Sequence, residues 1–255
     1  MNYSIFDPTG NITAIITSDT DASERTSEAD KVMALEPSVE QVGFFLPGHD
    51  GFDAGLFMAG GEFCGNASMS AAALYAINKG AVPGEKSSVV LRVSGTPDPV
   101  IVELECTGTN AFKGRVSMPE ALDITEAEIP DEPDMKVPVV LMPGIVHAIV
   151  PESFGIGKAE KVLPIMCAKL NADAMGMMLI DEAMTRITPV VYVPSAGTLV
   201  RENSCASGTA AVGAYIAADS AQHTRKSFSE PGGTLTAEAF PHGSIFIEGN
   251  VVLVK

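Results

Sequence analysis

Basic residues are scarce in this chain, and tryptophan is absent. The 255 residues include 16 Lys and Arg against 32 Asp and Glu, which gives a formal net charge of −16. Phosphate backbones and anionic lipid headgroups bind through clustered positive charge, which an acidic chain does not supply. The charge balance therefore argues against nucleic acid and membrane surfaces as partners. It says nothing against a small anionic ligand.

Long hydrophobic runs are also lacking. The longest apolar stretch, residues 137–150, is interrupted by two prolines, a glycine and a histidine. A membrane-spanning helix needs roughly 20 predominantly apolar residues, so none is predicted. The first residues show neither a basic leader nor the long apolar segment that a signal peptide requires. The sequence therefore predicts a soluble, cytoplasmic protein.

Metal-binding patterns are missing among the cysteines and histidines. The four cysteines, Cys64, Cys106, Cys167 and Cys205, form no Cys-x-x-Cys pair, although such pairs are the usual spacing of structural zinc sites. The four histidines are isolated from one another in the sequence. We expect free thiols, as is usual in the cytoplasm, and no bound metal.

Glycine and proline, at 24 and 17 residues, are spread along the chain and separate many short β-like runs. Helical periodicity occurs in four stretches, residues 22–35, 67–79, 158–170 and 209–218. This mixture predicts an α+β fold with much antiparallel sheet. The run 155–158, Gly-Ile-Gly-Lys, lacks the spacing and the following Ser or Thr of a phosphate-binding loop. We interpret it as a turn and a helix start.

The chain also repeats itself. Residues 62–75 and 204–215 each contain a cysteine, then small or polar residues, then an alanine-rich helix that carries a tyrosine. Strand-like runs flank both units, at 3–17 and 190–200 before them and at 89–105 and 227–240 after them. Internal self-similarity of this kind is the signature of a repeated architecture. We therefore predict two pseudo-symmetric lobes.

The boundary between the lobes is predicted within residues 126–136. This segment is rich in proline and acidic residues, which is typical of a solvated linker. It divides the chain into residues 1–128, which carry Cys64, and residues 129–255, which carry Cys205. Each lobe then contributes one of the two repeated cysteines.

Each repeated cysteine is expected just before the first turn of its helix, because the residues that follow it are small. The first amides of a helix lack internal partners and carry partial positive charge. A thiol there shifts toward the thiolate, and a carboxylate binds to the same amides. If both helix N-termini reach one cleft, one thiolate can remove an α-proton from one face of the bound ligand while the other thiol protonates the opposite face. This scheme requires no cofactor.

Other interpretations of the cysteines stay open. Most free cysteines are small buried hydrophobic residues, and we interpret Cys106, in a strand-like run, and Cys167, inside a predicted helix, in this way. A structural or redox disulfide between Cys64 and Cys205 is an alternative, and it would suit a non-enzymatic thiol redox sensor. An isomerase that acts on a carbon acid other than an amino acid is a further alternative.

The cysteine motifs match a known family. Residues 64–67, Cys-Gly-Asn-Ala, and 205–209, Cys-Ala-Ser-Gly-Thr, resemble the two active-site motifs of the diaminopimelate epimerase fold, which includes the proline racemases. A closer resemblance, to the histidine racemases of staphylopine-type metallophore biosynthesis, rests on residues 40–44, 61–67, 176–179 and 202–205. The resemblance covers nearly the whole chain. It implies two lobes, each a mostly antiparallel sheet or barrel around a central helix, and cofactor-independent interconversion of L- and D-histidine.

The resemblance also implies roles for individual residues. Cys64 and Cys205 would be the catalytic acid–base pair. The amino-acid substrate would be bound by residues that match the family motifs: Asn11, Gln41, Gly65, Asn66, Glu202, Ala206 and Ser207. Glu40 and Glu202 are candidates for contacting the α-ammonium or a cationic side chain, and a solvated charge near a loop is an equal alternative. A homodimer is one candidate assembly.

The chain departs from diaminopimelate epimerase where that enzyme holds the distal end of its substrate. Ala196 and Gly197 stand in place of a Glu-Arg pair, and Ile145 stands in place of an asparagine. A zwitterionic distal group would lack partners here. Proline racemases usually have a histidine where this chain has Asn66. The resemblance therefore favours histidine as substrate, with 2,4-diaminobutyrate next and diaminopimelate disfavoured.

Overall fold

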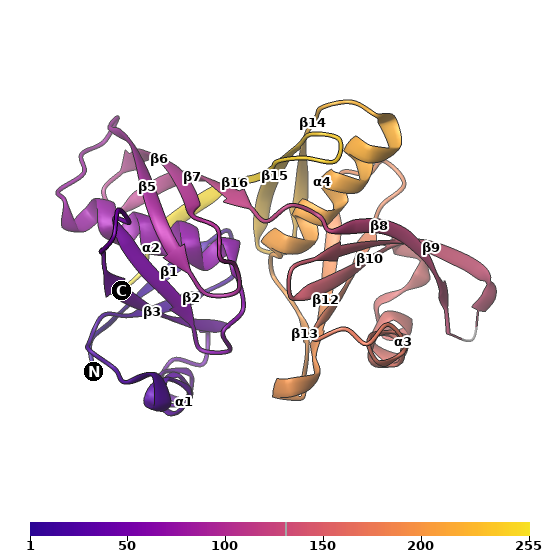
Figure 1. Ribbon diagram of the computed structural model, residues 1–255, viewed down its shortest axis with the longest axis horizontal. Helices are drawn as coiled ribbons and strands as arrows, with labels where there is room; N and C mark the ends of the chain where they lie inside the picture. The colour runs from indigo at the N-terminus through magenta and orange to yellow at the C-terminus, as the bar shows by residue number, and fades with distance from the viewer. Residues whose placement is uncertain (131) are drawn as a thin grey trace. The chain divides into compact units, whose positions relative to one another are not determined.

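The computed structural model describes residues 1–130 and 132–255, without the side chains of Pro133 and Ala196. The chain forms two compact units (Figure 1): Met1–Ser117 with Glu248–Lys255, and Met118–Ile247. The predicted α+β fold with two lobes is confirmed. The sequence placed the division at residue 128, whereas the structure divides the chain after Ser117 and returns its last segment to the first unit.

Eight strands of the first unit close into a barrel, because β1 pairs with β16 at the end of the order β1-β2-β3-β4-β5-β6-β7-β16. Their bounds are β1 (Tyr3–Pro8), β2 (Thr13–Ile16), β3 (Gln41–Pro47), β4 (Ala54–Met58), β5 (Lys86–Val93), β6 (Val100–Gly108), β7 (Ala111–Met118) and β16 (Ile245–Leu253). Several neighbours are antiparallel, but β2 runs parallel to β3, and β4 runs parallel to β5.

Each parallel pair needs a crossover connection, and each crossover in the first unit is a helix. η1 (Ala22–Glu24) and α1 (Arg25–Leu35) link β2 to β3, and α1 buries only Ala29 and Val32. α2 (Gly65–Asn78) links β4 to β5, is buried along most of its length, and contacts β1, β2, β4, β5 and β6 (Figure 1). Its small alanine and serine side chains let strands approach it closely from several directions.

The second unit contains a six-stranded sheet in the order β13-β12-β11-β10-β9-β8, and β14 and β15 continue the order from β16. The strand bounds are β8 (Asp123–Ile129), β9 (Glu132–Met142), β10 (Ile145–Pro151), β11 (Met175–Ile180), β12 (Ile187–Val193), β13 (Thr198–Arg201), β14 (Thr224–Glu230) and β15 (Gly233–Ala239).

Two longer helices connect these strands. η2 (Glu152–Phe154) and α3 (Ile156–Lys169) link the parallel strands β10 and β11, so the run 155–158 is a turn and helix start as predicted. η3 (Pro194–Ala196) lies between β12 and β13, and α4 (Ala206–Ser220) joins β13 to β14. α4 contacts β9, β10, β11, β14 and β15. Within the two described ranges, no helix is both long and apolar enough to cross a membrane.

The order of strand pairings in the first unit recurs in the second. β1–β2 is antiparallel, β2–β3 is parallel across α1, and β3–β4 is antiparallel; β9–β10, β10–β11 across α3, and β11–β12 follow the same pattern. The counterpart of residues 3–17 is therefore β9–β10, and the predicted counterpart, residues 190–200, is wrong. The antiparallel pairs β9–β10 and β12–β13 look alike in sequence. What identifies β9–β10 as the counterpart is that β10 then pairs parallel with β11, as β2 does with β3.

The predicted linker, residues 126–136, is instead a β-hairpin; its residue Asp131 lies outside the described residues. β8 and β9 pair antiparallel from Asp123 opposite Leu141 to Ile129 opposite Glu132. Ile129 is buried in a hydrophobic cluster with residues of α3. Glu126 and Glu128 occupy exposed positions of β8, an edge strand, so their charges reflect a solvated strand face.

The hydrophobic cluster between α3 and the second sheet gives a test of this packing. Leu163 is fully buried in the cluster, so Leu163→Ala should lower the free energy of unfolding by about 2–5 kcal/mol. Ile165 lies two positions further along the same helix and is 51% exposed, so Ile165→Ala should cost less than about 1 kcal/mol. Urea unfolding followed by circular dichroism compares the two variants. Equal losses would contradict the assignment of the buried face of α3.

Candidate functional site

Cys64 is the N-cap residue of α2. Its backbone is extended, with φ −137° and ψ 113°, and its sulfur accepts a hydrogen bond from the Ala67 amide at 3.4 Å. The thiol donates to Gln41 Oε1 at 3.0 Å. The structure thus places a partly exposed thiol at a helix N-terminus, where the small residues after Cys64 predict it.

A polar network lies beside this cysteine. Gln41 donates to Thr13 Oγ1 at 2.8 Å and to Asn11 Oδ1. Asn11 donates to Glu40 Oε2 at 2.7 Å, and Asn66 donates to Asn11 Oδ1 at 3.3 Å. These residues meet because β2 and β3 run parallel with Thr13 opposite Gln41. The residues that begin both strands therefore lie at the same end of the barrel. Asn11 and Asn66 are almost fully buried, which fixes their amide groups.

Cys205 has the matching place in the second unit, as the N-cap residue of α4 with φ −129° and ψ 98°. It is only 5% exposed, and its sulfur caps no amide of α4 in the described structure. The sulfur lies 3.6 Å from Ser207 Oγ. Gly208 makes this packing feasible, because a Cβ there would lie 2.1 Å from Met178 Sδ and 3.3 Å from the Cys205 sulfur.

His147, on β10, contacts Ser207 in the first turn of α4. It is fully buried, and its Nε2 lies 3.1 Å from Ser207 Oγ. Burial lowers the pKa of His147 to about 3, so the ring is neutral at neutral pH. Its buried Nδ1 has no partner among the described residues. Orphaned buried N–H groups are rarer than unused acceptors, so we infer that Nε2 carries the proton and donates to Ser207.

Two glutamates flank Cys205. Glu230, the last residue of β14, accepts a hydrogen bond from the Cys205 amide at 2.7 Å, and its other oxygen is bonded to the Thr209 hydroxyl. Glu202 hydrogen-bonds the Cys205 thiol. Burial, reinforced by the nearby charges of Glu202 and Glu230, raises the pKa of Cys205 well above its ordinary value. The expected shift toward thiolate is therefore wrong for Cys205, because desolvation and two carboxyl groups outweigh the helix dipole.

The predicted site residues fall into one group in each unit. The first unit holds Asn11, Gln41, Cys64, Gly65 and Asn66, and the second holds Glu202, Cys205, Ala206 and Ser207. Cys106 and Cys167 lie on β6 and α3, are buried as predicted, and belong to neither group; all four cysteines are free thiols. In the described part of the chain, no three His, Cys, Asp or Glu side chains are arranged to hold a metal ion.

Three residues of these networks, Thr13, His147 and Glu230, are not among the predicted site residues. Thr13 and His147 lie in apolar runs and resemble ordinary core residues. Glu230 offers a signal that was available, since it is a lone acid directly before the Pro-Gly-Gly turn at residues 231–233. The side chain of Ala196, where the family comparison predicted a lost polar contact, lies outside the described residues.

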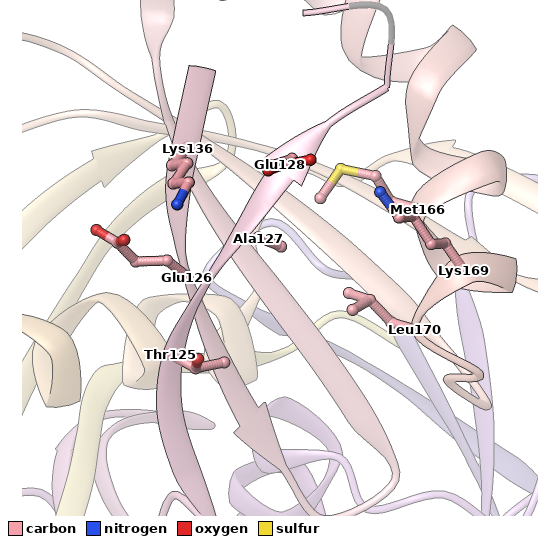
Figure 2. A pocket seen from close by; sticks show the side chains of 8 residues that line it. All are labelled: Thr125, Glu126, Ala127, Glu128, Lys136, Met166, Lys169 and Leu170. Carbon is pink, nitrogen blue, oxygen red and sulfur yellow. The ribbon is translucent and has the colours of Figure 1, made fainter. Parts of the chain in front are cut away.

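A separate pocket of about 620 Å³ lies between the β8–β9 hairpin and the end of α3. Figure 2 shows Met166 and Leu170 extending from α3 toward Ala127 of β8, with Glu126 and Lys136 on the hairpin. The pocket contains none of the predicted site residues. Its two glutamates and two lysines give it mixed charge and no convergent set of ligand-binding groups.

Comparison with known proteins gives consistent matches. A family described as "Histidine racemase CntK N-terminal domain" matches residues 1–254. A histidine racemase from Staphylococcus aureus is 30% identical over 223 residues, which is 84% of this chain and 79% of that protein. A histidine racemase from Fusobacterium nucleatum is 31% identical over 227 residues, which is 85% of this chain and 81% of that protein.

A solved structure shares the fold at much lower identity. A probable proline racemase from Agrobacterium radiobacter, solved with bound carbonate, superposes with a TM-score of 0.72 at 14% identity. The match covers 99% of this chain and 92% of that one. The two chains therefore share the two-lobe α+β fold with its eight-stranded barrel.

Gly176, on β11, provides the space that the His147 ring occupies. A Cβ there would lie 2.4 Å from His147 Nδ1 and 2.8 Å from Cε1. Gly176→Ala should displace the ring from Ser207 and destabilise the protein by about 1–3 kcal/mol. Gly157→Ala is the matched control, because a Cβ at this α3 position meets nothing within 4 Å and should stabilise the helix by up to about 1 kcal/mol. Equal thermal midpoints for the two variants would contradict this assignment.

Proposed function

Because the chain belongs to the histidine racemase family, we propose that it is an amino-acid racemase that interconverts L- and D-histidine without a cofactor. The family match spans nearly the whole chain, and both curated relatives are named for this reaction. The substrate is then a small amino acid whose α-carbon exchanges its proton.

One observation carries the proposed mechanism: the same cysteine–helix arrangement occurs once in each unit. Cys64 begins α2 and Cys205 begins α4, and in both places the next residues are small enough for a ligand to approach the helix amides. Stereoinversion at a carbon needs a proton acceptor on one face and a proton donor on the other. Two thiols at equivalent positions of the two units would supply the proton acceptor and the proton donor.

The proposed steps balance without an external reagent. One thiolate takes the α-proton, so a C–H bond breaks and an S–H bond forms, leaving a carbanion stabilised by the substrate carboxylate. The other thiol then gives its proton to the opposite face of the same carbon. The roles reverse in the other direction. The raised pKa of Cys205 suits the donor role, in the direction in which Cys64 removes the α-proton, since the Cys205 thiol holds a proton at neutral pH.

The remaining predicted residues are proposed to hold the substrate. The helix amides after each cysteine, with the Asn66 amide and the Ser207 hydroxyl, suit the α-carboxylate and the charge that develops on it. Asn11 and Gln41 form one hydrogen-bonded unit with Glu40, so a substrate that replaces any of these bonds meets a preorganised set of donors and acceptors. Glu40 and Glu202 are proposed partners of the α-ammonium or the imidazole.

We further propose that the two units are pseudo-symmetric lobes, each formed around its own helix. The repeated order of strand pairings and the strand contacts of α2 and α4 support this description. A cytoplasmic location and a homodimeric assembly stay predictions from the sequence.

Proton exchange in deuterated water tests the activity. L-Histidine should lose its α-proton signal in the NMR spectrum, because racemisation passes through a carbanion that takes a deuteron from the solvent-exchanged thiol. Chiral chromatography of the same sample should show D-histidine. 2,4-Diaminobutyrate and diaminopimelate serve as comparison substrates. Faster exchange of either one than of histidine would contradict the proposed substrate.

Substitution of the two cysteines tests the mechanism. Cys64→Ser and Cys205→Ser should each lower kcat by about 10²- to 10⁴-fold, because a serine hydroxyl is a far weaker proton acceptor than a thiolate. Cys106→Ala and Cys167→Ala are the controls, since both residues are buried outside the two groups. Full racemase activity in both serine variants would sink the two-cysteine mechanism.

A further inference from the structure

Glu230 is a buried carboxyl group that the proposed reaction does not use. It is 5% exposed, at the end of β14. One oxygen accepts a hydrogen bond from the Cys205 amide at 2.7 Å, and the other is bonded to the Thr209 hydroxyl. Both partners lie at the start of α4, more than 20 residues earlier in the chain. The carboxyl group therefore joins a strand end to the turn that carries Cys205.

This contact replaces a local helix cap. In a capping box, the third helical residue is Glu or Gln, and its side chain accepts the backbone amide of the N-cap residue. The third residue of α4 is Gly208, and a Cβ there would lie 2.1 Å from Met178 Sδ. A glutamate does not fit at that position. Glu230 accepts the N-cap amide from outside the helix instead.

The first unit holds its corresponding loop with a neutral group. Ser94, directly after β5, donates to the Glu62 carbonyl at 2.7 Å and accepts the Met58 amide at 2.9 Å. The β5–β6 and β14–β15 hairpins correspond in the repeated order of pairings. The segment before Cys64 is thus fixed by a hydroxyl, whereas the segment at Cys205 is fixed by a group that ionises.

We propose that Glu230 is a positioning residue that fixes the Cys205 turn and, through its own charge, controls how readily the Cys205 thiol gives up its proton. A negative Glu230 opposes a second negative charge on the sulfur, and Glu202 acts in the same direction. Ser207, whose hydroxyl oxygen lies 3.6 Å from the sulfur, and the neutral His147, which contacts Ser207, carry no charge that offsets this repulsion. The inference rests on the proposed role of Cys205 in proton transfer.

The charge on Glu230 changes within an accessible pH range. Burial raises the pKa of Glu230 from 4.5 to about 8, although the bonds from Thr209 and the Cys205 amide lower it. The carboxyl group is therefore neutral at neutral pH and charged above about pH 8. Because the folded protein keeps this proton after the unfolded chain has lost it, the contribution of Glu230 to stability is full below pH 4.5 and is lost as the pH rises to about 8.

Glu230→Gln tests the proposal directly, because glutamine resembles the neutral carboxyl group and keeps an acceptor for the Cys205 amide. Alkylation by iodoacetamide, resolved by mass spectrometry for each cysteine, reports the thiolate fraction of Cys205 against pH. At about pH 9 the variant should alkylate about three- to tenfold faster at Cys205 than the wild type, since one unit of pKa is a tenfold change in thiolate. Cys64 in the same sample is the internal reference and should react at an unchanged rate.

Two further variants keep the test decisive if folding is affected. Thr209→Val removes a bond that lowers the pKa of Glu230, so the pH at which Cys205 alkylation responds should move upward. Glu182→Gln removes one exposed charge of the same unit and should leave the profile unchanged. Thermal unfolding should show Glu230→Gln more stable than wild type at about pH 9 and similar to it at about pH 5.

The outcomes separate this inference from the proposed function. A Cys205 alkylation profile in Glu230→Gln that superposes on the wild-type profile, in a folded protein, overturns the control by Glu230. A shifted profile in a protein that exchanges no α-proton of histidine supports the link between Glu230 and the thiol and defeats the histidine racemase proposal. A shifted profile together with a shifted high-pH limb of kcat/KM supports both.

Discussion

A helix that begins directly after a cysteine is the constraint on which both units depend. A parallel strand pair requires a crossover, and the crossover helix α2 lies against five strands of its unit, so its residues must be small on nearly every face. Such a helix has few side chains to offer a ligand. Its free amides and the residue just before them are what it can present, and in both units that residue is a cysteine. The alanine-rich composition and the chemistry therefore have one origin.

The features that follow from local sequence could be predicted, and those that depend on pairing could not. The positions of Cys64 and Cys205 follow from small residues before an apolar helix. The hairpin at residues 126–136 has the composition of a loop, because it contains an edge strand with acidic residues at exposed positions, so composition alone predicts a linker there. The equivalence of β1–β2 with β9–β10 depends on which strands run parallel, and a single strand carries no mark of its partner. Glu230 and His147 reach the site through the same long-range pairings.

Desolvation decides the electrostatics of the second unit. The partial positive charge at the start of α4 favours a thiolate, but the cost of removing a charged sulfur from water opposes it. Cys205 is buried between Glu202 and Glu230, and both carboxyl groups favour the protonated thiol. The buried ring of His147 stays neutral for the same reason, so it orients Ser207 without adding charge. This arrangement keeps a proton on the Cys205 sulfur at neutral pH.

The two thiols of the proposed reaction are therefore inequivalent, although the chain repeats one design. A hydroxyl at Ser94 and a carboxyl at Glu230 hold corresponding turns, and only the second can acquire charge. The equilibrium constant between two enantiomers in solution is one, and a catalyst does not change it. The difference between the two thiols therefore cannot favour one product at equilibrium. It instead sets which protonation form of the free enzyme predominates, and each form accepts one enantiomer. Raising the pH through the ionisation of Glu230 then alters the balance between forms, and the two directions change in concert because their kcat/KM values must stay equal.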